Sequence, residues 1–407
     1  MLLRHRSARR QASWSVLPCA AADASSAARV AQDGIDPHSV ANSSLSAPGL
    51  PPDAIVSSLP HYCAGGLPGA KSAAIALPMK IAINGFGRIG RTILRQILTS
   101  PRGSGIEVVC INDITDAEMC AYLFQYDSTF GPYPGEVSLE AGTLCVDGRR
   151  IALHQEANVT NLDLAGVDVL MECTGIARTT DLAQRGLTAG ARKVLISGPS
   201  PAAEVTVVYG VNDADLAGAQ IVSNASCTTN AVAGLVQLVD AVAGIETGHM
   251  TTIHCYTNSQ PMVDTPRGDF ARSRGGAQSM VPTTTSAMHL IDVVLPRLKG
   301  RISGAAVRVP TASVSAVDLV ATLQSEWDQS DLLMALKASA NGSPILGWTE
   351  QPLVSSDLRA RPESLIIAAP ETRMVGTQQL RIFGWYDNEW GFSARMLDVA
   401  RAMQPQV

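Results

Sequence analysis

Short apolar runs alternate with helix-like segments in the first folded part of the chain, residues 79–226. Runs that are continuously apolar are typical of strands buried on both faces of a parallel sheet. The predicted strands are residues 80–84, 106–111, 167–172, 193–197 and 205–211. Because residues 91–98 have the pattern of a helix between the first two strands, this part of the chain predicts an α/β domain.

After residue 226 the pattern changes to long stretches in which apolar and polar positions alternate. These stretches are residues 249–257, 305–323 and 378–386. They predict a mostly antiparallel sheet, and therefore an α+β domain, over residues 227–387. An amphipathic helix at about residues 393–403 lies within the last segment, residues 388–407. We expect this segment to pack back on the first domain.

Residues 1–78 differ from the rest, because they are rich in Ala, Ser and Pro and show no lasting period. Four arginines precede Trp14, and the first acidic residue is Asp23. This start resembles an organelle transit peptide, which would direct the protein to a mitochondrion or plastid. The alternative is an over-long gene prediction in which Met79 is the natural start, which would leave a cytoplasmic protein. On both interpretations we expect residues 1–78 to be disordered and outside the core.

The composition, 46% apolar and 16% charged over 407 residues, is typical of a globular enzyme with two domains. A net charge of -5 provides no basic patch for nucleic acid and no attraction to a membrane. The eight cysteines include no Cys-x-x-Cys pair, so we expect neither a metal site nor a disulfide framework. This cysteine usage suits a reducing compartment.

A glycine-rich turn follows the first predicted strand, with the sequence Gly85-Phe86-Gly87-Arg88-Ile89-Gly90. Strand, G-x-G-x-x-G, helix, strand and a final acid, Asp113, form the pattern of a Rossmann-type dinucleotide site. Asp113 favours NAD over NADP, because a carboxylate repels a 2′-phosphate and accepts hydrogen bonds from a ribose diol. Thr174 and Ser197 follow later strands and are either cofactor neighbours or ordinary loop starts.

A strand-to-helix junction at residues 223–230 contains the candidate nucleophile, Cys227. A thiol in the first turn of a helix has a lowered pKa, because free N–H groups and the helix dipole favour an anion there. The neighbouring hydroxyls of Ser226 and Thr228 suit a second anion or an oxyanion. The alternative is a small buried cysteine in an ordinary helix start.

A polar loop at residues 258–285 carries three arginines and a run of three threonines. Arginine and hydroxyl groups are suited to phosphate oxygens, although a solvated surface charge is the commoner role for any one arginine. His254, in the strand before the loop, is a candidate base, with a core histidine as the alternative.

Seven motifs spread over residues 79–407, in order, resemble those of phosphorylating glyceraldehyde-3-phosphate dehydrogenase. They are residues 83–91, 112–113, 172–175, 223–230, 251–254, 308–311 and 386–390. The resemblance implies an NAD-dependent glycolytic enzyme that is a homotetramer and acts on a sugar phosphate and inorganic phosphate. Cys227 would form a thiohemiacetal and then a thioester, His254 would be its base, and Tyr386 would border the site.

The resemblance also implies binding residues for three ligand groups. The cofactor residues would be Gly85, Gly87, Arg88, Ile89, Asp113, Thr174, Ser197 and Asn388. The residues for inorganic phosphate would be Ser226, Thr228, Arg272 and Thr285, and those for the substrate's phosphate would be Thr257, Ser259 and Arg308.

Some positions depart from that family and keep two alternatives open. Ser259 replaces a usual Thr, Ser286 replaces a usual Gly, and residues 208–212 resemble the related erythrose-4-phosphate dehydrogenase, which hydrolyses its thioester. The second alternative is a non-catalytic, NAD-binding member of the family.

Overall fold

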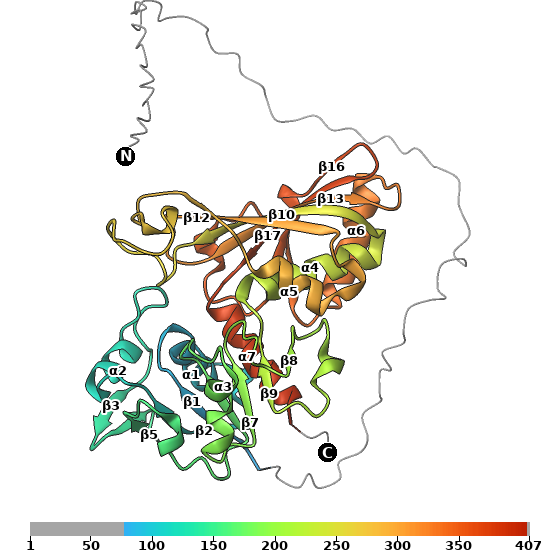
Figure 1. Cartoon of the computed structure of the whole chain (residues 1–407). Helices are drawn as coiled ribbons and strands as arrows, with labels where there is room; N and C mark the ends of the chain where they lie inside the picture. The colour runs from blue at the N-terminus through green and yellow to red at the C-terminus, as the bar shows by residue number, and fades with distance from the viewer. Residues whose placement is uncertain (1–76, 405–407) are drawn as a thin grey trace, which may run out of the picture. The chain divides into compact units, whose positions relative to one another are not determined.

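The structure is a computed structural model that describes residues 77–404. Figure 1 shows two sheets within this range, each associated with helices. The predicted N-terminal extension lies outside the described residues, apart from Leu77 and Pro78. No helix among residues 77–404 combines the length and the apolar character needed to cross a bilayer.

The first sheet has nine strands among the described residues, in the order β3-β4-β5-β2-β1-β6-β7-β9-β8. Its strands are β1 (Met79–Asn84), β2 (Ile106–Asn112), β3 (Val137–Glu140), β4 (Thr143–Val146), β5 (Arg149–His154), β6 (Val169–Glu172), β7 (Lys193–Ile196), β8 (Val205–Thr206) and β9 (Ile221–Ser223). Its helices are α1 (Arg88–Thr99), α2 (Ala117–Gln125) and α3 (Thr180–Thr188). All pairs are parallel except those that join β3, β4 and β5, so the prediction of a parallel α/β sheet is confirmed.

The last helix, α7 (Trp390–Ala402), packs against α1. Its buried side chains include Phe392, Met396 and Leu397, which join Ile93 and Leu94 of α1 in one hydrophobic core. Helix α7 therefore lies with the first sheet, next to the helix that begins after the glycine-rich turn (Figure 1).

The second sheet follows the order β11-β12-β10-β13-β17-β15-β14, and β16 also pairs with β17. Its strands are β10 (Ile245–Cys255), β11 (Val281–Thr283), β12 (Ile302–Val309), β13 (Ser315–Leu323), β14 (Leu346–Thr349), β15 (Leu365–Ala368), β16 (Arg373–Val375) and β17 (Gln379–Tyr386). Its helices are α4 (Cys227–Ala243), α5 (Ala287–Val294) and α6 (Gln329–Asn341). Among the described strands of this second sheet, only β10–β12 and β14–β15 pair in parallel. The predicted mostly antiparallel α+β arrangement is thus confirmed.

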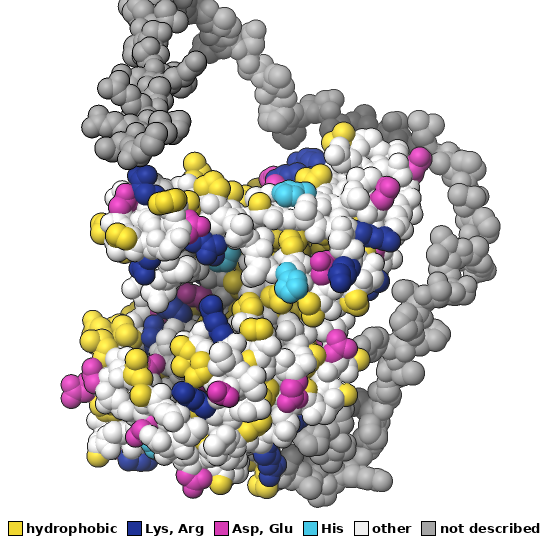
Figure 2. Space-filling model, viewed as in Figure 1, with side chains coloured by type: hydrophobic (Ala, Val, Ile, Leu, Met, Phe, Trp, Pro, Cys, Tyr) yellow, Lys and Arg dark blue, Asp and Glu magenta, His cyan; other side chains and the backbone are white. Residues whose placement is uncertain are grey.

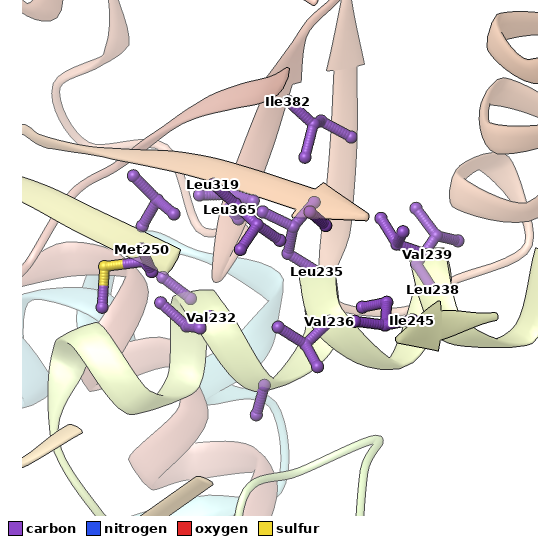
Figure 3. Close-up of a cluster of buried hydrophobic side chains, with 14 of the residues drawn as sticks. Val232, Leu235, Val236, Leu238, Val239, Ile245, Met250, Leu319, Leu365 and Ile382 are labelled. Carbon is purple, nitrogen blue, oxygen red and sulfur yellow. The ribbon is translucent and has the colours of Figure 1, made fainter. Parts of the chain in front are cut away.

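Helix α4 is the central element of the second core, because it presents apolar side chains along its whole length. Figure 3 shows these side chains meeting others from the surrounding strands. The labelled residues are Val232, Leu235, Val236, Leu238, Val239, Ile245, Met250, Leu319, Leu365 and Ile382. Burial of a Val, Leu or Ile side chain contributes about 1.5–3 kcal/mol, so this packing holds the start of α4, and with it Cys227, in place.

Two predicted strands are wrong in extent. Residues 305–323 form two strands, β12 and β13, because Pro310 at the break has no N–H for the ladder. Of residues 205–211, only Val205 and Thr206 pair as a strand. Val208 is fully buried in a turn instead, where its N–H donates to the side chain of Asn212 at 2.8 Å. An apolar run therefore marked burial there but not a strand.

Candidate active site

The loop between β9 and α4 places Cys227 at the first residue of the helix. Ser226 is the N-cap residue, and its hydroxyl accepts a hydrogen bond from the N–H of Thr229 at 3.0 Å. Ala225, which is fully buried, has φ of 54°, a left-handed conformation that costs energy for a residue with a side chain. The core around α4 enforces this tight turn, and the turn sets the position of the thiol.

His254, near the end of β10, faces the thiol. The Cys227 Sγ lies 3.7 Å from His254 Nε2. On the other side of the ring, Nδ1 lies 2.7 Å from the Cys255 carbonyl oxygen and 2.7 Å from the Arg308 Nη1. Nδ1 either donates to the carbonyl or accepts from Arg308. These two states are tautomers of the neutral ring. When Nδ1 carries the proton, Nε2 is an acceptor for the Cys227 thiol, and when Nδ1 accepts from Arg308, Nε2 carries the proton and is a donor.

Burial dominates the electrostatics of this pair. It lowers the pKa of His254 to about 4, and the positive charge of Arg308 adds to this effect. Burial also raises the pKa of the Cys227 thiol, although Arg308 and the N–H groups of Thr228 and Cys227 oppose the increase. The predicted lowered pKa of the isolated thiol is therefore wrong, because desolvation of the thiolate outweighs the helix N-terminus.

Tyr386, the last residue of β17, connects the nucleophile's helix to the histidine's strand. Its hydroxyl lies 2.9 Å from the Thr228 Oγ1 and 2.8 Å from the Thr252 Oγ1. Its ring meets His254 edge-on, with centroids 6.0 Å apart. Burial raises the pKa of Tyr386, so the hydroxyl keeps its proton and bridges both threonines. Thr252 was not among the predicted site residues, although it lies in the motif that ends with His254.

A cavity of about 370 Å³ lies at the carboxyl ends of β1, β2 and β6. Its lining includes Gly85, Gly87, Asp113 and Thr174. Asp113 accepts hydrogen bonds from the N–H of Phe86 at 2.6 Å and from that of Thr115 at 2.9 Å. These bonds fix the carboxylate at the edge where an open parallel sheet binds its ligand.

The three glycines of the turn fit a dinucleotide. A Cβ on Gly85 would meet the backbone of Cys173 at 2.7 Å, and one on Gly90 would meet the Gly85 oxygen at 2.2 Å. A Cβ on Gly87, by contrast, would meet nothing within 4 Å. The first and third glycines are thus required for packing, whereas the second leaves open the space in which a pyrophosphate approaches the N-terminus of α1.

A buried carboxylate positions Thr174 at the mouth of this cavity. Glu172 accepts from Asn84 Nδ2 at 2.6 Å and from the Thr174 N–H at 2.9 Å, and it also bonds the Thr174 hydroxyl. Glu172 was not among the predicted site residues. Its place at the end of β6, two residues before Thr174, was the available signal.

The remaining predicted cofactor residues lie at the same sheet edge or near it. Arg88 begins α1, but its guanidinium binds the carboxylates of Asp127 and Glu389 and lies over the Phe130 ring. Ile89 is half-buried in α1, and the Ser197 N–H, directly after β7, donates to the backbone carbonyl of Glu172. Asn388, 8% exposed, follows β17.

The predicted phosphate residues fall into two groups. Arg308 and Thr228 join the Cys227–His254 pair through the contacts described above. Ser226 lies at the same helix start, as the N-cap residue directly before Cys227. The others lie in or next to the polar loop, where Thr257 and Ser259 share a hydrogen bond of 2.8 Å and Arg272 donates to the Thr284 carbonyl at 3.3 Å. Within residues 77–404, no hydrogen bond connects this second group to the pair.

A dinucleotide cavity and a pair formed by a partly exposed cysteine and a buried histidine in one chain define an NAD-dependent oxidoreductase with a thiol nucleophile. Family comparison makes this specific. Residues 79–180 match the NAD binding domain of glyceraldehyde 3-phosphate dehydrogenase, and residues 226–388 match its C-terminal domain. The chain belongs to the glyceraldehyde-3-phosphate dehydrogenase family.

Curated relatives cover 80% of this chain and nearly all of their own length. Glyceraldehyde-3-phosphate dehydrogenase of Pseudomonas aeruginosa is 47% identical over 330 residues, which is 98% of that protein. The enzyme of Zymomonas mobilis is 45% identical over 334 residues, and glyceraldehyde-3-phosphate dehydrogenase 1 of Bacillus subtilis is 42% identical over 330 residues.

Proposed function

We propose that this protein catalyses the NAD-dependent oxidation of glyceraldehyde 3-phosphate with phosphorylation to 1,3-bisphosphoglycerate. The observation that carries the proposal is the 3.7 Å approach of Cys227 Sγ to His254 Nε2 at the first turn of α4. It supports covalent catalysis by a thiol with an adjacent base. The similarity to relatives of that name supports the choice of substrate.

The cofactor residues have distinct roles. Gly85 and Gly87 shape the turn, and the N–H groups that begin α1, at Arg88 and Ile89, face an anion. Asp113 accepts from the ribose diol. Thr174 and Ser197 contact the rest of the cofactor, and Asn388 orients the nicotinamide carboxamide. When bound, NAD supplies the acceptor for the substrate's hydride.

Cys227 becomes a nucleophile by transfer of its proton to His254. Burial penalises either charge alone, but a thiolate and an imidazolium form together across 3.7 Å. At this separation and an effective dielectric constant of about 20, their attraction is worth about 4 kcal/mol. The N–H groups of Cys227 and Thr228, with the cation of Arg308, favour the sulfur's negative charge.

The thiolate then attacks the aldehyde carbon. The C–S bond forms, the carbonyl electron pair moves to oxygen, and the Cys227 N–H and His254 stabilise the oxyanion. His254 first protonates this oxygen and then removes the same proton as the hydride departs, which leaves a thioester on Cys227. A phosphate oxygen attacks the thioester carbon, and the C–S bond breaks to restore the thiolate.

Two phosphate sites complete the proposal. Ser226, Thr228, Arg272 and Thr285 take inorganic phosphate. The substrate's own phosphate binds Thr257, Ser259 and Arg308. Support comes from the position of Arg308 next to His254, where β10 and β12 pair in register. A guanidinium there suits a phosphate by charge and by geometry.

We also propose that the protein is a homotetramer. Helix α2 and its C-cap residue, Tyr126, expose four large apolar side chains at the spacing of a single helix face. Met119, Tyr122, Leu123 and Tyr126 are between 36% and 57% exposed. Figure 2 shows hydrophobic side chains gathered in this part of the surface. Apolar groups concentrated on one helix face are typical of an interface.

The proposed domain bounds, residues 79–226, 227–387 and 388–407, are supported by the junction between β9 and α4.

A kinetic comparison with the full-length protein tests the function. NADH formation from glyceraldehyde 3-phosphate should require phosphate or arsenate, and Cys227→Ser should abolish turnover while NAD still binds. Phosphate-independent turnover of erythrose 4-phosphate would identify the related dehydrogenase instead. A protein that gives no NADH with either sugar phosphate, and whose Cys227 resists alkylation, would be a non-catalytic family member.

A further inference from the structure

A buried thiol lies directly against the amide of Asn388. Cys255 ends β10, is fully buried, and places its Sγ 3.1 Å from the Asn388 Oδ1. The alternative acceptor for this thiol, His254 Nδ1, lies farther away at 3.8 Å. It is also contacted by the Cys255 carbonyl and by Arg308. Burial raises the pKa of Cys255 to about 12, so the sulfur keeps its proton and donates to the amide oxygen.

The backbone around Asn388 is fixed independently of this contact. The Asp387 carboxylate accepts from the N–H of Glu389 at 3.0 Å, of Trp390 at 2.8 Å and of Ala360 at 2.9 Å. The terminal amide of Asn388 has no comparable restraint of its own, because the last torsion of an asparagine is broad and roughly two-fold. Its orientation therefore depends on what lies next to the amide.

We propose that Cys255 is a positioning residue that orients the Asn388 amide so that its nitrogen, rather than its oxygen, faces the nicotinamide carboxamide. This inference rests on the proposed function, in which Asn388 contacts the cofactor. Within the described residues, the Asn388 nitrogen donates to no protein atom, whereas its oxygen accepts the Cys255 thiol. The nitrogen is thus the group left for a ligand.

The consequence is a selectivity for cofactors that carry a carbonyl acceptor. An Asn388 nitrogen donates to the carbonyl oxygen of the nicotinamide carboxamide. Without the thiol the amide can turn, and its oxygen then needs an N–H from the cofactor. NAD can supply one by rotating its own carboxamide, but 3-acetylpyridine adenine dinucleotide has the carbonyl and no N–H.

The test compares kcat/KM for NAD and for 3-acetylpyridine adenine dinucleotide in full-length Cys255→Ala, Cys255→Ser and wild-type protein. In Cys255→Ala we expect the preference for NAD to rise by a factor of about 3 to 10, the equivalent of one net hydrogen bond. Serine keeps a donor, so Cys255→Ser should retain the wild-type preference. Cys120→Ala removes another buried thiol, one 3.8 Å from the Thr115 carbonyl, and should leave the preference unchanged.

Two further measurements keep the result unambiguous. In an Asn388→Ala background, Cys255→Ala should no longer alter the preference, because the amide it orients is gone. If the wild type lacks turnover, the proposed function fails, and dissociation constants for both dinucleotides test the positioning role without it. An unchanged preference for NAD in folded Cys255→Ala, or an equal rise of that preference in Cys255→Ala and Cys255→Ser, would overturn the proposal.

Discussion

Replacement of His254 by glutamine tests whether the imidazole is what makes Cys227 reactive. Burial raises the pKa of the thiol, so without a proton acceptor Cys227 should remain protonated at pH 7. The lost attraction across 3.7 Å is about 4 kcal/mol, or about 3 pKa units. The thiolate population at neutral pH should then fall by up to about 1000-fold.

The rate of alkylation should fall less than the thiolate population does. A more basic thiolate is a better nucleophile, with a Brønsted coefficient of about 0.4–0.5, which restores about 30-fold over 3 pKa units. We therefore expect His254→Gln to react with iodoacetamide about 30-fold more slowly at pH 7. Its rate should continue to rise with pH beyond the point at which the wild-type rate levels off.

The assay follows alkylation of the Cys227 peptide by mass spectrometry, in the absence of NAD. Burial raises the pKa of four other thiols to about 11 or 12, so they should react slowly at pH 7. These are Cys110, Cys120, Cys173 and Cys255. The matched control is His249→Gln, since His249 lies on the same strand but is exposed and contacts Ser303. Wild-type reactivity in folded His254→Gln would refute the proton transfer.

Two other predictions rest on the glycine turn and on the charge of the buried ring. Gly87→Ala should fold, because its Cβ meets nothing within 4 Å, but should weaken NAD binding by about tenfold or more in calorimetry. Gly90→Ala, with a contact of 2.2 Å, should lower the yield of folded protein. In folded Cys227→Ser, the pKa of His254 should stay near 4, whereas the same histidine in the unfolded chain has a pKa near 6.5. Between pH 4 and pH 6.5 the unfolded chain therefore binds more protons than the folded protein. Urea unfolding should therefore show stability falling by about 3 kcal/mol as the pH drops through this window, and His254→Gln in the same background should remove the slope.

The parts of the site that were predictable from the sequence are those built from consecutive residues. The glycine turn and the helix start at Cys227 follow from local backbone requirements, so their positions could be predicted without the fold. His254 and Arg308 meet because β10 and β12 pair in register, although they are 54 residues apart. Tyr386 reaches Thr228 across 158 residues. Their mutual geometry depends on strand order, which the apolar pattern alone does not define.

Burial and distant charges determine two features of the site that the local sequence does not show, the pKa of Cys227 and the partners of the Arg88 side chain. The local sequence of Cys227 indicates a helix N-terminus, which lowers a thiol's pKa, but the depth at which the helix start lies is a property of the whole core. Arg88 follows the glycine turn, and we propose that its N–H, rather than its side chain, faces the cofactor. Two carboxylates bind its guanidinium, from Asp127 and Glu389, 39 and 301 residues away.

Arg308 connects substrate binding to the reactivity of the base. Its positive charge contributes to the low pKa of His254, because a cation next to the ring disfavours the imidazolium. If the substrate's phosphate binds Arg308, as we propose, the added negative charge offsets that cation and raises the pKa of His254. The ring then accepts a proton more readily when the aldehyde is bound than when it is absent. The same negative charge also offsets the attraction between Arg308 and the Cys227 thiolate, so the pKa values of the thiol and of the ring should rise together. The substrate's phosphate would thus favour the later step, in which His254 removes the proton of the thiohemiacetal hydroxyl and no thiolate is present.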